Sequence, residues 1–157
     1  MRGVYTASAD ITGLAAAKTL MYITAPATAA VEILSVHVVD YNNNSSEQWK
    51  ISFQRITSLS PTPTGTTVDA TTGLQKHENG DQASTVTCKS NITANEPTYD
   101  TVGPVDRQGV SNLAGYHYDP TPEERPIIAP SGTFGLYMHS TPTSTNVGVM
   151  IVYREIG

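Results

Sequence analysis

The feature that most constrains the fold is the alternation of apolar and polar side chains with a period of two. In residues 48–57, Trp49, Ile51 and Phe53 share one face of an extended chain, and polar side chains occupy the other. Residues 133–140 and 146–154 alternate similarly, and residues 31–39 (VEILSVHVV) are apolar on both faces. Because strand side chains point alternately to opposite faces, these segments are predicted to be β-strands. The expected core contains Leu34, Trp49, Ile51, Phe53, Leu136, Val149 and Ile151.

The remaining segments indicate turns and long loops. Residues 19–24 and 125–129 are weaker strand candidates beside prolines. Residues 40–46 (DYNNNSS) have turn composition, and residues 58–73 begin a connection rich in Thr, Pro and Gly that shows no clear period until residue 85. This pattern predicts a single-domain, all-β protein, an antiparallel β-sandwich of the jelly-roll kind. We expect an N-terminal arm over residues 1–18, which could add a strand to a neighbouring subunit, and a sandwich domain over residues 19–157.

Composition excludes several classes of partner. The 157 residues contain nine Lys and Arg against fourteen Asp and Glu, for a net charge of −5, and only 15% are charged. So few positive charges cannot neutralise many phosphates, which argues against nucleic acid and anionic membranes as partners. The longest apolar stretch, residues 14–39, is interrupted by Lys18, Pro26 and Glu32, so no membrane span is predicted. The N-terminus lacks the apolar core of a signal peptide, and the single cysteine, Cys88, is expected to be a buried apolar residue.

Motifs for catalysis and for cofactor binding are absent from the sequence. There is no Walker loop, G-x-G-x-x-G, G-x-S-x-G or H-E-x-x-H pattern. The four histidines, at positions 37, 77, 117 and 139, lack the short spacing with which one strand or helix presents two metal ligands. Neighbouring carboxylates such as Glu123 and Glu124 are expected to be solvated rather than to act as acid and base. We therefore expect a protein without enzymatic activity, cofactor or metal.

Residues 107–132 form the least ordinary segment. Four prolines, at positions 120, 122, 126 and 130, restrict their own backbone and that of the preceding residues. Tyr and Arg are common in interfaces, and a rigid segment loses less entropy when it docks. The candidate interaction residues are Arg107, Tyr116, Tyr118, Arg125 and Pro126. Alternatively, the two tyrosines cover the end of the sandwich.

Three strings in the C-terminal part carry a resemblance. They are NEPTYD at residues 95–100, SNLAGYHYDPTPEERPIIAPSGTFGL at 111–136 and VYREIG at 152–157. From about residue 91 onward the chain resembles proteins that recur in the head-gene clusters of tailed bacteriophages, where small β-sandwich proteins serve as capsid decoration or cement. The resemblance implies a virion structural protein, made in the host cytoplasm and placed on the outer capsid surface. It also implies a homotrimer whose partner is the major capsid protein.

A second function from another class also fits a sandwich with aromatic loops. The chain could form the receptor- or glycan-binding head of a phage tail fibre, spike or adhesin. The only tryptophan, Trp49, alternates with Ile51 and Phe53, which is more typical of a core residue than of a sugar-stacking platform. The role of residues 58–73 is left open.

Overall fold

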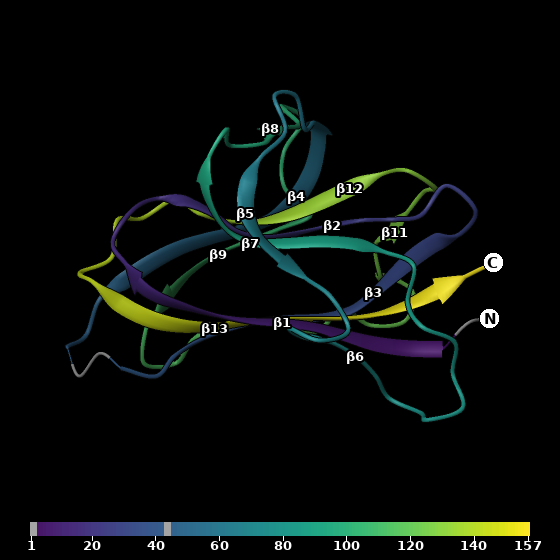
Figure 1. Ribbon diagram of the computed structural model, residues 1–157. Coiled ribbons are helices and arrows are strands. Elements are labelled where there is room, and N and C mark those ends of the chain that lie inside the picture. The colour runs from purple at the N-terminus through teal and green to yellow at the C-terminus, as the bar shows by residue number, and fades with distance from the viewer. Residues whose placement is uncertain (1–2, 43–44) are drawn as a thin grey trace.

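The structure is a computed structural model that describes residues 3–42 and 45–157. The described residues form two antiparallel sheets that pack as a β-sandwich (Figure 1). The strands are β1 (Gly3–Leu14), β2 (Lys18–Thr24), β3 (Ala30–Asp40), β4 (Gln48–Ser58), β5 (Thr64–Val68), β6 (Leu74–Lys76), β7 (Thr87–Ala94), β8 (Thr98–Tyr99), β9 (Asp106–Ser111), β10 (Tyr116–Tyr118), β11 (Ile127–Ile128), β12 (Thr133–Met138) and β13 (Thr145–Ile156). The expected all-β fold class is therefore confirmed.

The chain crosses repeatedly between the two sheets. Sheet A has the order β10-β3-β13-β1-β6, with β11 also paired to β3. Sheet B has the order β5-β7-β2-β12-β4-β8, with β9 also paired to β4. Consecutive strands β1, β2, β3 and β4 alternate between the sheets, as do β9, β10, β12 and β13. Strands β5 to β8, which lie between these two sets in sequence, extend the sheets at their edges.

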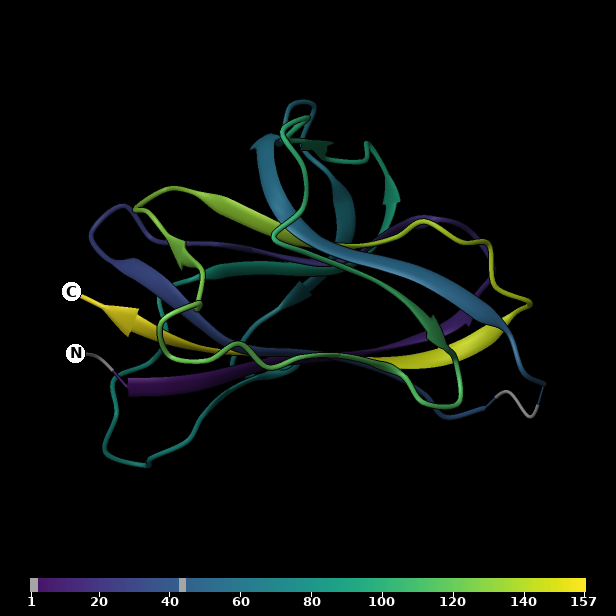
Figure 2. The same ribbon diagram turned by 180° about the vertical axis from the view of Figure 1, so that it is seen from behind.

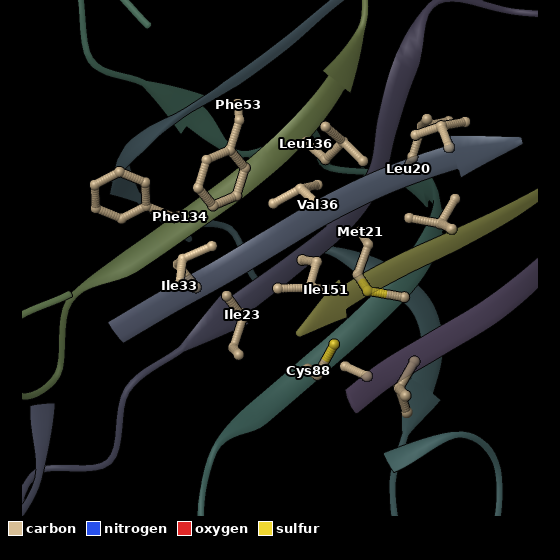
Figure 3. Packing of buried hydrophobic residues seen from close by; sticks show 14 of the residues in the cluster. Leu20, Met21, Ile23, Ile33, Val36, Phe53, Cys88, Phe134, Leu136 and Ile151 are labelled. Atoms are coloured by element: carbon tan, nitrogen blue, oxygen red, sulfur yellow. The ribbon is translucent and has the colours of Figure 1, made fainter. Parts of the chain in front are cut away.

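The core lies between the sheets and contains six of the seven expected residues. Trp49, Ile51, Phe53, Leu136, Val149 and Ile151 are all at most 1% exposed. Figure 3 shows Ile33, Val36 and Ile151 of sheet A meeting Met21, Ile23, Phe53 and Leu136 of sheet B. The inward set of each strand matches its apolar period, so burial of these side chains stabilises both the strands and their packing.

Leu34 is a correction to the expected core. The alternation placed Leu34 with Val36 and Val38, but the pairing of β3 with β13 shifts register between Ser35 and Ile33, which leaves Leu34 as an extra residue. A β-bulge of this kind reverses the phase of alternation. Ile33 on one side of it and Val36 on the other are both fully buried, whereas Leu34 is only half-buried.

The N-terminal segment also differs from its expected role as an arm. Gly3–Leu14 form β1, which lies inside sheet A between β13 and β6 and pairs from Gly3 opposite Glu155 onward. Tyr5 and Ala7 are fully buried, so part of the range 1–18 belongs to the sandwich itself. The outward side chains of β1 include Thr and Ser, and one of its inward residues is an alanine, so the strand shows only a weak hydrophobic pattern. This weak pattern explains why the sequence indicated an N-terminal arm.

The long connection after β4 contains short strands and covers the outside of sheet B. Residues 58–73 include β5, and β6 follows directly; both are short edge strands with mostly exposed side chains, so their period is weak. Tyr22, Ile56 and Ile92 form a second apolar cluster, against which Leu59 of this connection packs. Tyr22 pairs with Gly135, whose neighbours Phe134 and Leu136 point into the main core, so this cluster lies on the opposite face of sheet B. A Cβ at Gly135 would lie 2.7 Å from Ile56 Cδ1 and from the Tyr99 hydroxyl, so a larger residue there would have to push these side chains aside.

Candidate functional site

Residues 106–128 cross from one sheet to the other and form an edge of the sandwich. Strand β9 pairs with β4 in sheet B, whereas β10 and β11 pair with β3 in sheet A. The turn between β9 and β10 contains Gly115 at φ +76°, where a Cβ would lie 2.7 Å from the Val38 carbonyl oxygen. Figure 2 shows this green segment turning at one end of the sandwich and returning along sheet A. We call β10, residues 119–126, β11 and the outward side chains of β3 the β3 edge.

The structure places Tyr116 in the core and Tyr118 beside it. Tyr116 is fully buried, and its hydroxyl donates a hydrogen bond of 2.6 Å to Asp106 Oδ2. Burial, helped by that carboxylate, raises the pKa of Tyr116 far above its ordinary value. Tyr118 is half-buried, with its ring centroid 6.2 Å from that of Phe53. Tyr116 therefore covers the sandwich, as the alternative interpretation holds, and its side chain offers no surface to a partner.

The other three candidate residues lie in different surroundings. Arg125 Nη1 is 3.7 Å from Glu32 Oε1, and Arg154 Nε donates to Glu32 Oε2 at 2.7 Å. The Pro126 carbonyl accepts a hydrogen bond of 3.0 Å from the Ile33 amide, which fixes the connection against β3. Arg107 is exposed on β9, opposite Ser52 in sheet B. Arg125 and Pro126 thus belong to the β3 edge, while Arg107 belongs to the other sheet.

Sequence reasoning missed a polar cluster on the β3 edge. His37 of β3 lies directly opposite His117 of β10, and Asp119 follows the end of β10. His37 Nε2 is 2.8 Å from Asp119 Oδ1, and the two imidazole centroids are 4.9 Å apart. The histidines are 80 positions apart in the sequence, so residue spacing could not pair them. Their only local signal is that each lies between inward residues of its strand and therefore points outward.

The surface beside this cluster is hollowed and partly apolar. A hollow of about 300 Å³ is lined by Asp10, His37, Val39 and Met150, among others, and by Gly148, which contributes no side chain. Val39 is 44% exposed and Ile127 of β11 is 61% exposed. The β3 edge therefore combines exposed apolar side chains with a rigid, proline-rich connection.

A second cavity, of about 500 Å³, lies at the opposite side of the sandwich. It is lined by residues of β1, β5, β6 and β7, including Tyr5, Val68, Leu74 and Cys88. Burial raises the pKa of the Cys88 thiol to about 12, so the thiol stays protonated at neutral pH. Cys88 is 1% exposed, as expected for a buried apolar residue rather than a reactive one.

A serine and a histidine meet on sheet B. Ser52 Oγ lies 2.7 Å from His139 Nε2, and the His139 ring contacts Tyr137 at 4.8 Å between centroids. Burial of the ring lowers the pKa of His139, and the nearby charges of Lys50 and Arg107 lower it further. Because Ser52 is fully buried, a substrate cannot reach its hydroxyl, and the pair serves as an internal hydrogen bond.

Comparison with protein-family models, curated proteins and solved structures found no match for the chain. Of the residues that the structure describes, none forms a helix with the length and apolar character that a membrane crossing requires.

Proposed function

We propose that this protein is a capsid decoration, or cement, protein of a tailed bacteriophage. It binds the major capsid protein on the outer surface of the virion and stabilises the shell without catalysing a reaction. The observation that carries the proposal is the β3 edge, in which exposed Val39 and Ile127 flank a connection stiffened by prolines. A rigid surface with exposed apolar side chains loses little entropy when it docks on another protein.

The order of the strands supports this proposal. In sheet A, the order β1, β13, β3, β10 places each strand beside the next. In sheet B, β2, β12 and β4 follow one another in the same way, and β9 pairs with β4. We infer from this order a jelly roll of eight strands, to which β5–β8 are added at the edges. Jelly rolls are common in viral capsid domains and in lectins. The fold therefore favours the decoration protein and the glycan-binding head about equally, and the surface has to distinguish them.

The burial of the only tryptophan and of Tyr116 favours decoration, although Tyr41, which follows β3, is 52% exposed. Protein sites for sugars commonly stack an exposed aromatic ring on the sugar face, and Trp49 and Tyr116 are buried at 1% and 0% exposure. The exposed side chains of the β3 edge that we assign to docking are aliphatic. Glycan binding by a tail fibre or spike remains the second candidate function.

Glu32 of the β3 edge is compensated within the chain, whereas Glu123 and Glu124 are exposed to water. Glu32 is held between Arg125 and Arg154, so these three charges pair with one another rather than with a partner. Docking through the remaining apolar and uncharged groups is expected to weaken only slightly with added salt. Many copies on one shell add modest contact energies that act together, because opening the shell must break several contacts at once.

The test uses phage particles that lack this protein, with purified protein added back. Particles without it are expected to lose their DNA at a lower temperature, and added wild-type protein is expected to restore the heat resistance. Ile127→Asp places a charge on the β3 edge and should weaken binding at least about tenfold, because the carboxylate loses its water at the interface. Val102→Asp is the matched control, since Val102 is 92% exposed in the connection that follows β8 of sheet B.

Three results would count against the proposal. Particles that lack the protein and survive heat as well as complete particles would show that it does not stabilise the shell. Electron microscopy that finds the protein at the tail tip would favour the glycan-binding head. Equal binding of the Ile127→Asp and Val102→Asp variants would remove the β3 edge as the docking surface.

A further inference from the structure

We propose that His37, His117 and Asp119 form a binding site for a divalent transition-metal ion of the Zn²⁺ class. One ligand atom from each residue lies within 4.8 Å of the other two. Within residues 3–42 and 45–157, this is the one group of three such side chains that comes so close together. The proposal does not depend on docking to a capsid, and it departs from the absence of metal that the histidine spacing led us to expect.

The distances require only a small adjustment around an ion. Zinc binds imidazole nitrogen and carboxylate oxygen at about 2.0–2.2 Å, so tetrahedral ligand atoms lie roughly 3.3 Å from one another. His37 Nε2 and Asp119 Oδ1, at 2.8 Å, are already inside that separation. The Asp119 side chain is 59% exposed and lies just beyond the end of β10, so it can rotate to admit the ion.

Strand pairing holds the two histidines in place. His37 and His117 are directly opposite each other in the β3–β10 ladder, and the neighbouring residues Val36, Val38 and Tyr116 are fixed in the core. Folding therefore orders the backbone of β3 and β10 around the two histidines before any ion binds. A site whose ligands are already placed loses less entropy on binding than one made of mobile loops.

A backbone carbonyl orients the second histidine. His117 Nε2 is 3.1 Å from the carbonyl oxygen of Ala114, which can only accept a hydrogen bond. Nε2 therefore carries the proton in this contact, which leaves the lone pair on Nδ1 for a metal. Ala114 is itself fixed in the turn, because its amide donates to the Ser111 carbonyl at 3.0 Å. Histidine ligands commonly donate their second N–H to such a carbonyl, and the contact fixes both tautomer and ring.

The donor set defines the class of ion. Two imidazoles and one carboxylate suit Zn²⁺, Cu²⁺ or Ni²⁺, whereas Mg²⁺ and Ca²⁺ prefer sites built from oxygen. Three protein ligands leave at least one coordination position open to water or to a donor from another molecule. The site therefore binds a transition ion in preference to Mg²⁺.

The experiment is calorimetric titration of tag-free, chelator-treated protein with Zn²⁺ and, separately, with Mg²⁺. One Zn²⁺ per chain is expected, with no measurable binding of Mg²⁺. His117→Ala and Asp119→Asn should each weaken Zn²⁺ binding at least about tenfold. His77→Ala is the matched control: His77 is an exposed histidine whose Nε2 contacts Thr6 Oγ1, away from the cluster. It should bind Zn²⁺ like the wild type.

Thermal unfolding provides a second readout for the same proteins. An ion that binds only the folded chain raises the unfolding temperature. Zn²⁺ should therefore raise it for wild type and His77→Ala, and should leave Asp119→Asn almost unchanged. Asp119 is exposed, so this variant is expected to fold like the wild type. No stoichiometric Zn²⁺ binding by wild-type protein, or equal binding by Asp119→Asn and His77→Ala, would overturn the proposal.

Discussion

Burial decides which polar side chains of this protein can act at its surface. Tyr116 carries a polar group in a segment that favours interaction, yet its hydroxyl is bonded to Asp106 inside the molecule. Ser52 and His139 resemble a catalytic pair by residue type, but burial of Ser52 turns the contact into a structural one. His37 and His117 show the opposite outcome, because both point away from the core and remain available to a ligand.

His139 is expected to make the stability of the protein depend on pH. Burial lowers its pKa below the ordinary 6.5, so the unfolded chain takes up this proton more readily than the folded chain. As pH falls from above 6.5 through the lowered pKa, the proton stabilises the unfolded state, and the free energy of unfolding decreases. His139→Gln removes the titrating ring, so this variant should lose less stability than wild type between about pH 8 and about pH 5.

Urea unfolding at both pH values measures this difference. At about pH 8 the imidazole is neutral, so the two proteins give a baseline for the substitution itself. If wild type and His139→Gln lose the same free energy of unfolding on acidification, His139 does not contribute to the pH dependence.

At the scale of elements, alternation locates strands well and their faces less well. The segments 31–39, 48–57, 133–140 and 146–154 correspond to β3, β4, β12 and β13, because each has a face that must leave water. In β3 the bulge at Leu34 brings both halves of the strand into the core. The apolar character of both faces, which indicated a strand buried on both sides, arises from this change of phase.

The bulge predicts different costs for two adjacent aliphatic residues. Ile33→Ala should lower the free energy of unfolding by about 2–5 kcal/mol, because it leaves a cavity in a closed core. Leu34→Ala should cost less than about 1.5 kcal/mol, since its side chain is half-buried on the outer face. Urea unfolding of both variants measures the difference, and a larger cost at Leu34 would mean that uninterrupted alternation describes β3 better.

At the scale of the whole molecule, the two sheets form a closed sandwich that leaves apolar residues exposed at its margins. The 107–132 segment presents Leu113 at 63% exposure, in the turn between β9 and β10 and outside the β3 edge. The exposure of Leu113 is the reason to propose a symmetric oligomer. Cyclic symmetry lets one such segment in each copy be covered by its neighbour.

We propose that the protein is a homotrimer in solution. Light scattering coupled to size exclusion at micromolar concentration should give about three times the chain mass of 16.8 kDa. Leu113→Asp, which places a charge in the proposed contact, should shift the mass toward that of one chain, because a buried unpaired carboxylate is costly. A wild-type mass of 16.8 kDa would remove the trimer, and decoration would then rest on contacts with the shell alone.

The sequence by itself determined the all-β class, the four main strands and most of the core, because local alternation records which face of each strand leaves water. Only the tertiary structure decided the rest. The phase change at Leu34 depends on register with β13, and burial of Tyr116 depends on where the chain crosses from β9 in sheet B to β10 in sheet A. The meeting of His37 with His117 depends on strand pairing across 80 residues. Contacts between strands that are distant in sequence leave no trace in local spacing, so neither the period nor the motifs could reveal them.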